Sequence, residues 1–155
     1  MGVDMQSRVA ELEAEVRRLR ARDADRVIAP DAAVATFQAA ITMWEQEHFV
    51  VAVLDARQRP LDVLVIGMGH VDVHPRDVFR HAIRTNAHAI IIGHNHPSGD
   101  LKPSHADIEL TQRLVTAGEI VGIRVLDHII FDETAGRSLA ANREMPKPRK
   151  GSSCD

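Results

Sequence analysis

The chain has 155 residues, of which 45% are hydrophobic, enough for one domain with its own core and a short appendage. A net charge of −3 argues against a general nucleic-acid binder, although basic residues gather near the N-terminus and in KPRK at 147–150. The single cysteine, Cys154, cannot form an intramolecular disulfide, and no apolar run is long enough for a membrane span. We therefore expect a cytoplasmic protein that does not enter a membrane.

Residues 4–25 have the pattern of a polar helix, and residues 1–30 are predicted to form a separate N-terminal helix. One narrow apolar seam has the alternating spacing of a short coiled coil; it consists of Met5, Val9, Leu12, Val16 and Leu19. A helix of this length is marginal alone in water. It could pair with a second copy, pack on its own domain, dock on a partner or stay solvated. We favour a homodimer through this helix.

A second helix is predicted from Asp31, as N-cap, to about Glu45. Its apolar residues recur at helical spacing and indicate one buried face; they are Val34, Phe37, Ile41 and Trp44. HFVVAVLDA, just after Glu47, is rich in β-branched residues and predicts a strand. The RQRP turn then leads into LDVLVIGMG, the expected antiparallel return strand.

A loop over residues 69–74 precedes a helix that is predicted from Pro75 to about Asn86. AHAIIIGH follows as a nearly continuous apolar strand of the kind that is buried on both faces. Three other histidines have no metal-ligand spacing relative to one another, and we expect them to be structural or solvated: His74, His81 and His88.

The stretch GHNHPSGDLKPSHAD, residues 93–107, holds the most chemically specific pattern of the chain. His94 and His96 are two residues apart at the end of a strand, so both imidazoles face one side. Ser104 then opens a helical pattern, with Asp107 one turn further on. Two nitrogens and one oxygen are the ligand set of a catalytic zinc that keeps a fourth position for water. S-x-x-D also approaches a capping box, so Ser104 and Asp107 could simply start the helix.

ADIELTQRLVTAGEIV predicts an amphipathic helix, IRVLDHIIFD a strand, and residues 138–141 a final short strand. Residues 146–155 have the composition of a disordered tail. The predicted order is helix, two strands, helix, strand, helix and one or two strands. This order indicates an α/β sandwich with a mixed sheet.

His94, His96 with the following proline, Ser104 and Asp107 match the JAMM (JAB1/MPN) metalloprotease signature at every position and spacing. The wider wording HNHPSGDLKPSHAD, followed by VLDHII, resembles the bacterial RadC branch of that superfamily. The resemblance covers roughly residues 33–145. It implies an MPN/JAB-type domain over residues 31–145, a mixed sheet with flanking helices in a cytidine-deaminase-like sandwich. It also implies a Zn²⁺ site formed by His94, His96 and Asp107.

The family also has a glutamate on an early strand, and Glu47 stands at the matching place, with Glu45 as the rival two residues upstream. Zinc would lower the pKa of a bound water to about 7, and Glu47 would act as general base and acid. Ser104 would donate a hydrogen bond to the oxyanion, the role of its family counterpart, or cap its helix instead. Asp127 and His128 belong to VLDHII, part of the segment that resembles the RadC branch, but we assign them no chemistry and expect a structural role.

The leading hypothesis is a zinc-dependent metallohydrolase, a metallopeptidase or isopeptidase acting on a protein or peptide substrate. The first alternative is a metal-binding scaffold with little turnover. The second is an accessory role in DNA repair or DNA metabolism, as the RadC label suggests. The sequence supports that role weakly, because it has no surface pattern of interleaved aromatic and basic residues for stacking on single strands.

Overall fold

The computed structural model describes residues 8–9, 13–15, 29–69 and 72–149. The short N-terminal stretches 8–9 and 13–15 are helical, while most of the predicted seam lies outside the described residues. The longer elements follow in chain order: α2 (Pro30–Ala40), β1 (His48–Leu54), β2 (Pro60–Met68), α3 (Pro75–Arg84), β3 (Ala89–Asn95), α4 (His105–Val121), β4 (Arg124–Phe131) and β5 (Gly136–Ser138).

The five strands form one mixed sheet in the order β2-β1-β3-β4-β5. Strands β3 and β4 are parallel, whereas the other neighbouring pairs are antiparallel. A parallel pair needs a crossover connection, and α4 makes this one. The predicted fold class, an α/β domain with a mixed sheet and flanking helices, is confirmed.

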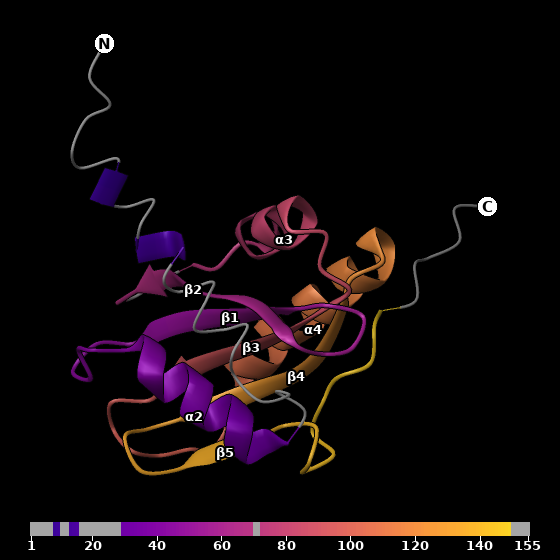
Figure 1. The fold of residues 1–155 in the computed structure, drawn as a ribbon. Coiled ribbons are helices and arrows are strands. Elements are labelled where there is room, and N and C mark those ends of the chain that lie inside the picture. Colours follow the sequence, from indigo (N-terminus) through magenta and orange to yellow (C-terminus); the bar gives the residue numbers. More distant parts are fainter. Residues whose placement is uncertain (1–7, 10–12, 16–28, 70–71, 150–155) are drawn as a thin grey trace.

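Helices cover both faces of the sheet (Figure 1): α2 packs on one face, and α3 and α4 on the other. On the α2 side, the ring of Phe37 lies 5.8 Å from the ring of Phe131. On the other side, Phe79 of α3 and Leu114 of α4 pack against the sheet. The central strands β1 and β3 are buried along their whole length, as expected for β3 from its continuous apolar run.

Helix α2 begins earlier than predicted. Ala29 is its N-cap, and Asp31 lies in the first turn with no capping role, so the predicted N-cap is wrong. Pro30 explains the difference, because its fixed φ angle and missing N–H suit the first helical position. Of the predicted apolar face, Val34, Phe37 and Ile41 are buried, and Trp44 is partly buried.

The same helix also ends earlier than predicted, since the backbone becomes extended at Ile41. Trp44 therefore lies in the segment between α2 and β1 rather than on a helix. Its ring still meets Phe131 edge to face, with centroids 6.0 Å apart. The apolar pattern therefore identified residues that pack in the core, but the helix predicted from it was too long.

Gly93, next to His94, allows α2 to lie close to β3. A Cβ atom at this position would lie 2.5 Å from a ring carbon of Phe37 and 3.1 Å from the carbonyl oxygen of Ile129. Only a residue without a side chain fits such a close approach. The end of β3 that carries the histidines is therefore packed directly beneath α2.

The end of the described chain lies along α4. The N–H of Arg149 donates to Thr116 Oγ1 at 3.0 Å, and its Nε donates to Gln112 Oε1 at 3.1 Å. Residues 146–149 are therefore held by α4, although the composition of residues 146–155 predicts a disordered tail. Strand β5 spans Gly136–Ser138, so it shares only Ser138 with the strand predicted over residues 138–141, and residues 139–141 form a turn instead. None of the described helices combines the length and apolar character needed to cross a membrane.

Candidate metal centre

The three residues predicted as metal ligands meet where β3 ends and α4 begins. His94 Nε2 lies 2.7 Å from His96 Nε2. The carboxylate of Asp107 lies 3.1 Å from His94 Nε2 through Oδ1 and 3.5 Å from His96 Nε2 through Oδ2. One donor atom from each residue lies within 4.8 Å of the others, so this group could hold a metal ion.

The loop after β3 determines which nitrogen of His96 faces this centre. His96 Nδ1 lies 2.5 Å from the carbonyl oxygen of Asp100. A carbonyl only accepts, so Nδ1 carries the hydrogen, and in the neutral ring Nε2 presents its lone pair to the centre. Gly99, with φ +77°, makes the turn that brings Asp100 back to the ring.

Asp107 combines a structural and a chemical role. Its Oδ2 accepts the N–H of Ser104 at 2.7 Å, and its own N–H donates to Ser104 Oγ at 3.1 Å, which completes a capping box. Burial alone would raise the pKa of Asp107. When Nε2 of His94 or His96 carries a proton, it can donate to the carboxylate, and these hydrogen bonds outweigh burial and hold that pKa well below its usual range. A bound metal ion would take the place of that proton. The carboxylate is therefore ionised, the form that binds a cation.

Ser104 is exposed and caps α4 as an acceptor. The cap uses a lone pair of Oγ and leaves the hydroxyl hydrogen for another acceptor. The two roles that the sequence suggests for Ser104, helix cap and oxyanion donor, are therefore chemically compatible.

Asn95, between the two histidines, ties β3 to the segment that carries Glu47. Its buried side chain accepts the N–H of His48 at 2.7 Å and donates to the carbonyl of Gln46 at 2.9 Å. Both backbone groups next to Glu47 are thus fixed by one amide. The sequence gives no sign of this link, because it joins segments that lie far apart in the chain.

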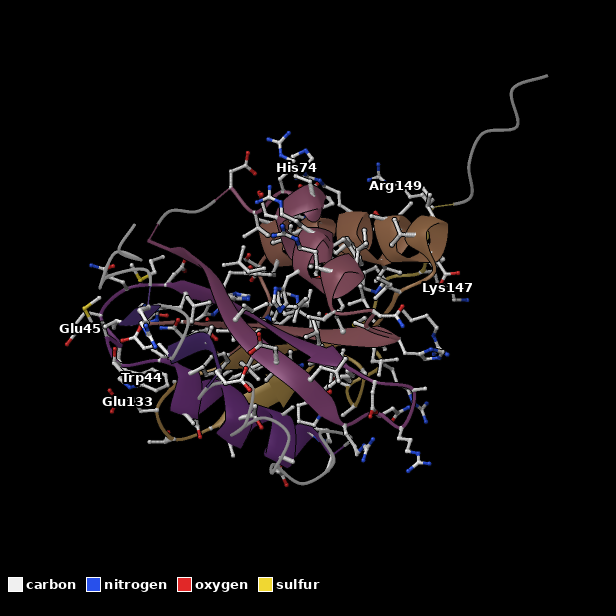
Figure 2. All side chains as sticks on the ribbon, turned by 45° about the horizontal axis from the view of Figure 1, so that its top comes forward. Trp44, Glu45, His74, Glu133, Lys147 and Arg149 are labelled. Carbon is white, nitrogen blue, oxygen red and sulfur yellow. The ribbon has the colours of Figure 1, made fainter. Side chains whose placement is uncertain are left out.

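Glu47 is exposed at the start of β1, and its carbonyl accepts the N–H of Gly69 at 2.7 Å. Hydrogen bonding to Asp107 raises the pKa of His96, and the nearby charge of Glu47 contributes in the same direction, while burial opposes both. Glu47 stands two residues before Phe49, which pairs with His94, so its backbone lies beside the end of β3 that leads to the candidate ligands. Figure 2 shows Glu45 on the loop before β1, pointing away from the body of the molecule.

His128, to which sequence reasoning assigned no chemistry, lies directly behind His94. Its Nε2 lies 2.8 Å from His94 Nδ1, and its Nδ1 lies 2.6 Å from the hydroxyl of Thr111. The ring is fully buried. Burial lowers the pKa of His128 well below its usual value, and the neighbouring His94 adds to that effect. The sequence signal was a histidine directly before the apolar run Ile129–Phe131 of a strand, because a polar ring that is buried there needs a partner.

Asp127 has the structural role that was expected. Its carboxylate accepts the Ser138 hydroxyl at 2.5 Å and the N–H of Ala140 at 2.9 Å, which ties β4 to the chain after β5. Burial raises the pKa of Asp127 against these hydrogen bonds. The Asp127 carboxylate also accepts the backbone N–H of His128 at 2.7 Å.

The other predicted non-ligand histidines lie elsewhere. His74 Nδ1 accepts the N–H of Arg76 at the start of α3, and His81 Nε2 lies 3.0 Å from Asp62 Oδ2. His88 is exposed. Among the described residues, the group that could hold a metal ion consists of His94, His96 and Asp107.

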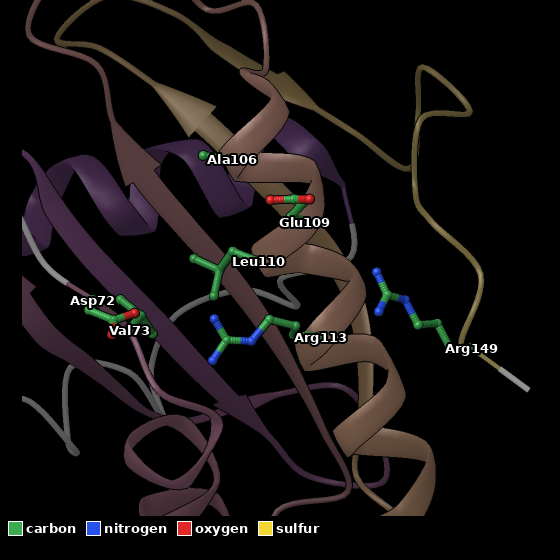
Figure 3. A pocket seen from close by; sticks show the side chains of 7 residues that line it. All are labelled: Asp72, Val73, Ala106, Glu109, Leu110, Arg113 and Arg149. Carbon is green, nitrogen blue, oxygen red and sulfur yellow. The ribbon is translucent and has the colours of Figure 1, made fainter. Parts of the chain in front are cut away.

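A groove of about 370 Å³ runs beside α4 (Figure 3). Ala106, on the first turn of α4, forms one end of its lining, whereas none of the three candidate ligands lines it. Arg113 extends across it toward Asp72, while Arg149 lies on the other side of α4. The complete lining consists of Asp72, Val73, Ala106, Glu109, Leu110, Arg113 and Arg149.

The donor set fits a metal ion. His94 Nε2 and His96 Nε2, only 2.7 Å apart beside an ionised carboxylate, need a proton or a cation between them. Two imidazole nitrogens and a carboxylate oxygen form a ligand set that suits zinc among other divalent metals. The fold and centre define a mixed-sheet α/β domain with a His–His–Asp group for a metal.

The chain belongs to the family of the RadC-like JAB domain, whose model matches residues 27–145. It is 48% identical over 113 residues to a UPF0758 protein of Desulforudis audaxviator, covering 71% of this chain and 49% of that protein. It is 42% identical over 135 residues to a UPF0758 protein of Syntrophotalea carbinolica, covering 85% and 60%. The chain thus spans about half the length of the curated relatives it matches. The predicted membership of the RadC-like JAB/MPN family is confirmed.

Proposed function

We propose that this protein is a zinc-dependent metallohydrolase that cleaves peptide or isopeptide bonds. The observation that carries the proposal is the meeting of two histidine nitrogens and an ionised carboxylate at the junction of β3 and α4. Zinc bound there would supply Lewis acidity and activate a water at neutral pH. The family also supports a metal-dependent hydrolase.

Glu47 is the residue that we assign to proton transfer. The exposed residue precedes β1, whose Phe49 pairs with His94, and its charge contributes to the raised pKa of His96. It would take a proton from the attacking water and return it to the leaving amine. Asn95 holds the backbone on both sides of Glu47 and so limits how far the carboxylate can move.

Ser104 is the residue that we assign to the oxyanion. Its hydroxyl hydrogen stays available because the cap uses Oγ as an acceptor. A donor that is fixed before reaction stabilises developing negative charge without reorganisation. Ser104 is exposed, so a protein or peptide substrate could reach its hydroxyl from solvent.

The test has two stages. Elemental analysis of the purified protein should find one zinc per chain, and His94→Ala and Asp107→Ala should lose it while keeping the parent circular dichroism spectrum. The zinc-loaded and chelated parent are then compared on a library of peptides and isopeptides. Stoichiometric zinc in both variants would refute the ligand assignment. A loaded protein that cleaves no member of the library would favour a metal-binding scaffold.

A further inference from the structure

A continuous chain of hydrogen bonds leads from His94 back to Asp107 through the interior. His94 Nδ1 contacts His128 Nε2 at 2.8 Å, and His128 Nδ1 contacts Thr111 Oγ1 at 2.6 Å. Thr111 Oγ1 in turn donates to the carbonyl oxygen of Asp107 at 2.5 Å. His128 and Thr111 are both fully buried, so water does not compete for these contacts. Two of the three candidate ligands are therefore linked behind the centre as well as within it.

The direction of each hydrogen bond follows from the carbonyl at the end of the chain. The carbonyl of Asp107 can only accept, so Thr111 must use its one hydrogen there. The Thr111 oxygen is then the acceptor for His128 Nδ1–H. In a neutral His128, Nε2 has no hydrogen and must accept from Nδ1–H of His94. With both imidazoles neutral, this is the one arrangement that satisfies every contact.

This arrangement also determines the state of His94 Nε2. Because the hydrogen of the neutral His94 ring is on Nδ1, Nε2 presents a lone pair to the metal centre. His96 has the same tautomer, because its Nδ1 donates directly to the carbonyl of Asp100. A ligand histidine commonly donates its second N–H to a carboxylate, a carbonyl or water. Here the acceptor for His94 is another histidine, buried in β4.

We propose that His128 is a positioning residue of the metal centre, which accepts the hydrogen of His94 Nδ1 and so holds His94 Nε2 ready for the metal. This inference rests on the proposed function, because it names a residue that prepares the same centre. His128 itself does not touch the metal or the substrate. Thr111 orients His128, because its hydroxyl donates its hydrogen to the carbonyl of Asp107 and can therefore only accept from His128 Nδ1.

Zinc affinity is the first measurement, made by competition with a chromophoric chelator. His128→Phe removes the acceptor but keeps a ring in the space, and we expect zinc to bind about 10- to 100-fold more weakly. His128→Gln places an amide oxygen near the position of Nε2 and should recover part of the affinity. Equal affinity in the folded parent and His128→Phe would overturn the inference.

Thr111→Val offers a milder change with a matched control. Thr111 and Thr116 both donate to the carbonyl four residues earlier on α4, but only Thr111 contacts His128. We therefore expect Thr111→Val to weaken zinc binding and Thr116→Val to leave it unchanged. An equal effect of both substitutions would mean that helix stability, rather than the link to His128, affects the centre.

The metal-free protein provides a second readout that does not depend on the proposed function. Nitrogen-15 NMR of the histidine rings should show His94 with its hydrogen on Nδ1 in the parent and lose that restriction in His128→Phe. If the parent binds no zinc but Nδ1 of His94 carries a hydrogen that is donated to His128, the proposed function fails while the hydrogen bond that orients His94 is established. If Nδ1 of His94 carries no hydrogen in the parent, the inference is wrong, whatever the zinc affinity.

Discussion

Glu47 is the residue that separates an enzyme from a metal-binding scaffold. Three ligands are enough to hold a metal, but cleavage of an amide also needs a group that accepts a proton and returns it. The structure holds Glu47 near the centre through backbone contacts of its neighbours, Gln46 and His48, with Asn95. Its exposed side chain can therefore meet a substrate without being a ligand.

We expect Glu47→Gln to keep stoichiometric zinc and to lose hydrolysis by about a hundredfold or more, the range for removal of a general base. Glu45→Gln is the matched control and should change turnover little, since Glu45 points outward from its loop. Turnover of a substrate found in the library and zinc content are measured on the same samples. If Glu47→Gln cleaves that substrate at the parent rate, Glu47 is not the base.

Helix α4 illustrates how one element serves structure and site together. Its first turn contains the capping box of Ser104 and Asp107, and Asp107 faces the two histidines from the same turn. The next turn contains Thr111, which leads to His128. Fraying of this helix end would therefore move a ligand as well as a helix cap.

Substitutions of Ser104 separate its two roles. Ser104→Ala should reduce the free energy of unfolding by about 0.5–2 kcal/mol, whereas Ser104→Gly should cost only a few tenths, because glycine is tolerated at the N-cap. Both variants lack the hydroxyl that would donate to the oxyanion. Chemical denaturation gives the stabilities, and turnover is measured at a temperature where both are folded. A glycine variant with full turnover would restrict Ser104 to capping.

Gly93 tests the contact between α2 and β3. Gly93→Ala should destabilise the protein by about 1–3 kcal/mol, the usual cost of overpacking, because its Cβ would lie 2.5 Å from the Phe37 ring. Phe37→Leu removes the nearest ring atoms, so the double variant should be less destabilised than the sum of the two single variants. Denaturant unfolding of all four proteins measures this coupling. Strict additivity would show that the contact with Phe37 is not the cause.

For the whole molecule, the N-terminal seam over Met5–Leu19 remains a prediction, since most of it lies outside the described residues. We expect the full chain to self-associate weakly through it, and a chain beginning at Asp31 to be monomeric. Light scattering over a range of concentrations compares the two masses. Equal monomeric masses at the highest concentration would leave a solvated helix or one that docks on a partner.

Local patterns in the sequence determined most of the elements and the candidate metal group. The apolar run of β3 predicted a buried strand, and the spacing of His94, His96 and Asp107 predicted the metal group, because a strand, a turn and a helix start follow from residues near one another. The same patterns gave wrong bounds for helix α2. Pro30 moved the start of α2, and the segment after Ala40 left the helix although the apolar spacing continues to Trp44.

Contacts between distant segments were decided by the tertiary structure alone. Asn95 reaches Gln46 and His48 because β1 pairs with β3, and His128 reaches His94 because β4 lies parallel to β3. A strand pattern predicts which residues are buried, but it does not determine which strands become neighbours or in what register. The candidate ligands could be predicted from the sequence because they are close together in it, whereas the contact of His94 with His128 depends on which strand lies beside β3.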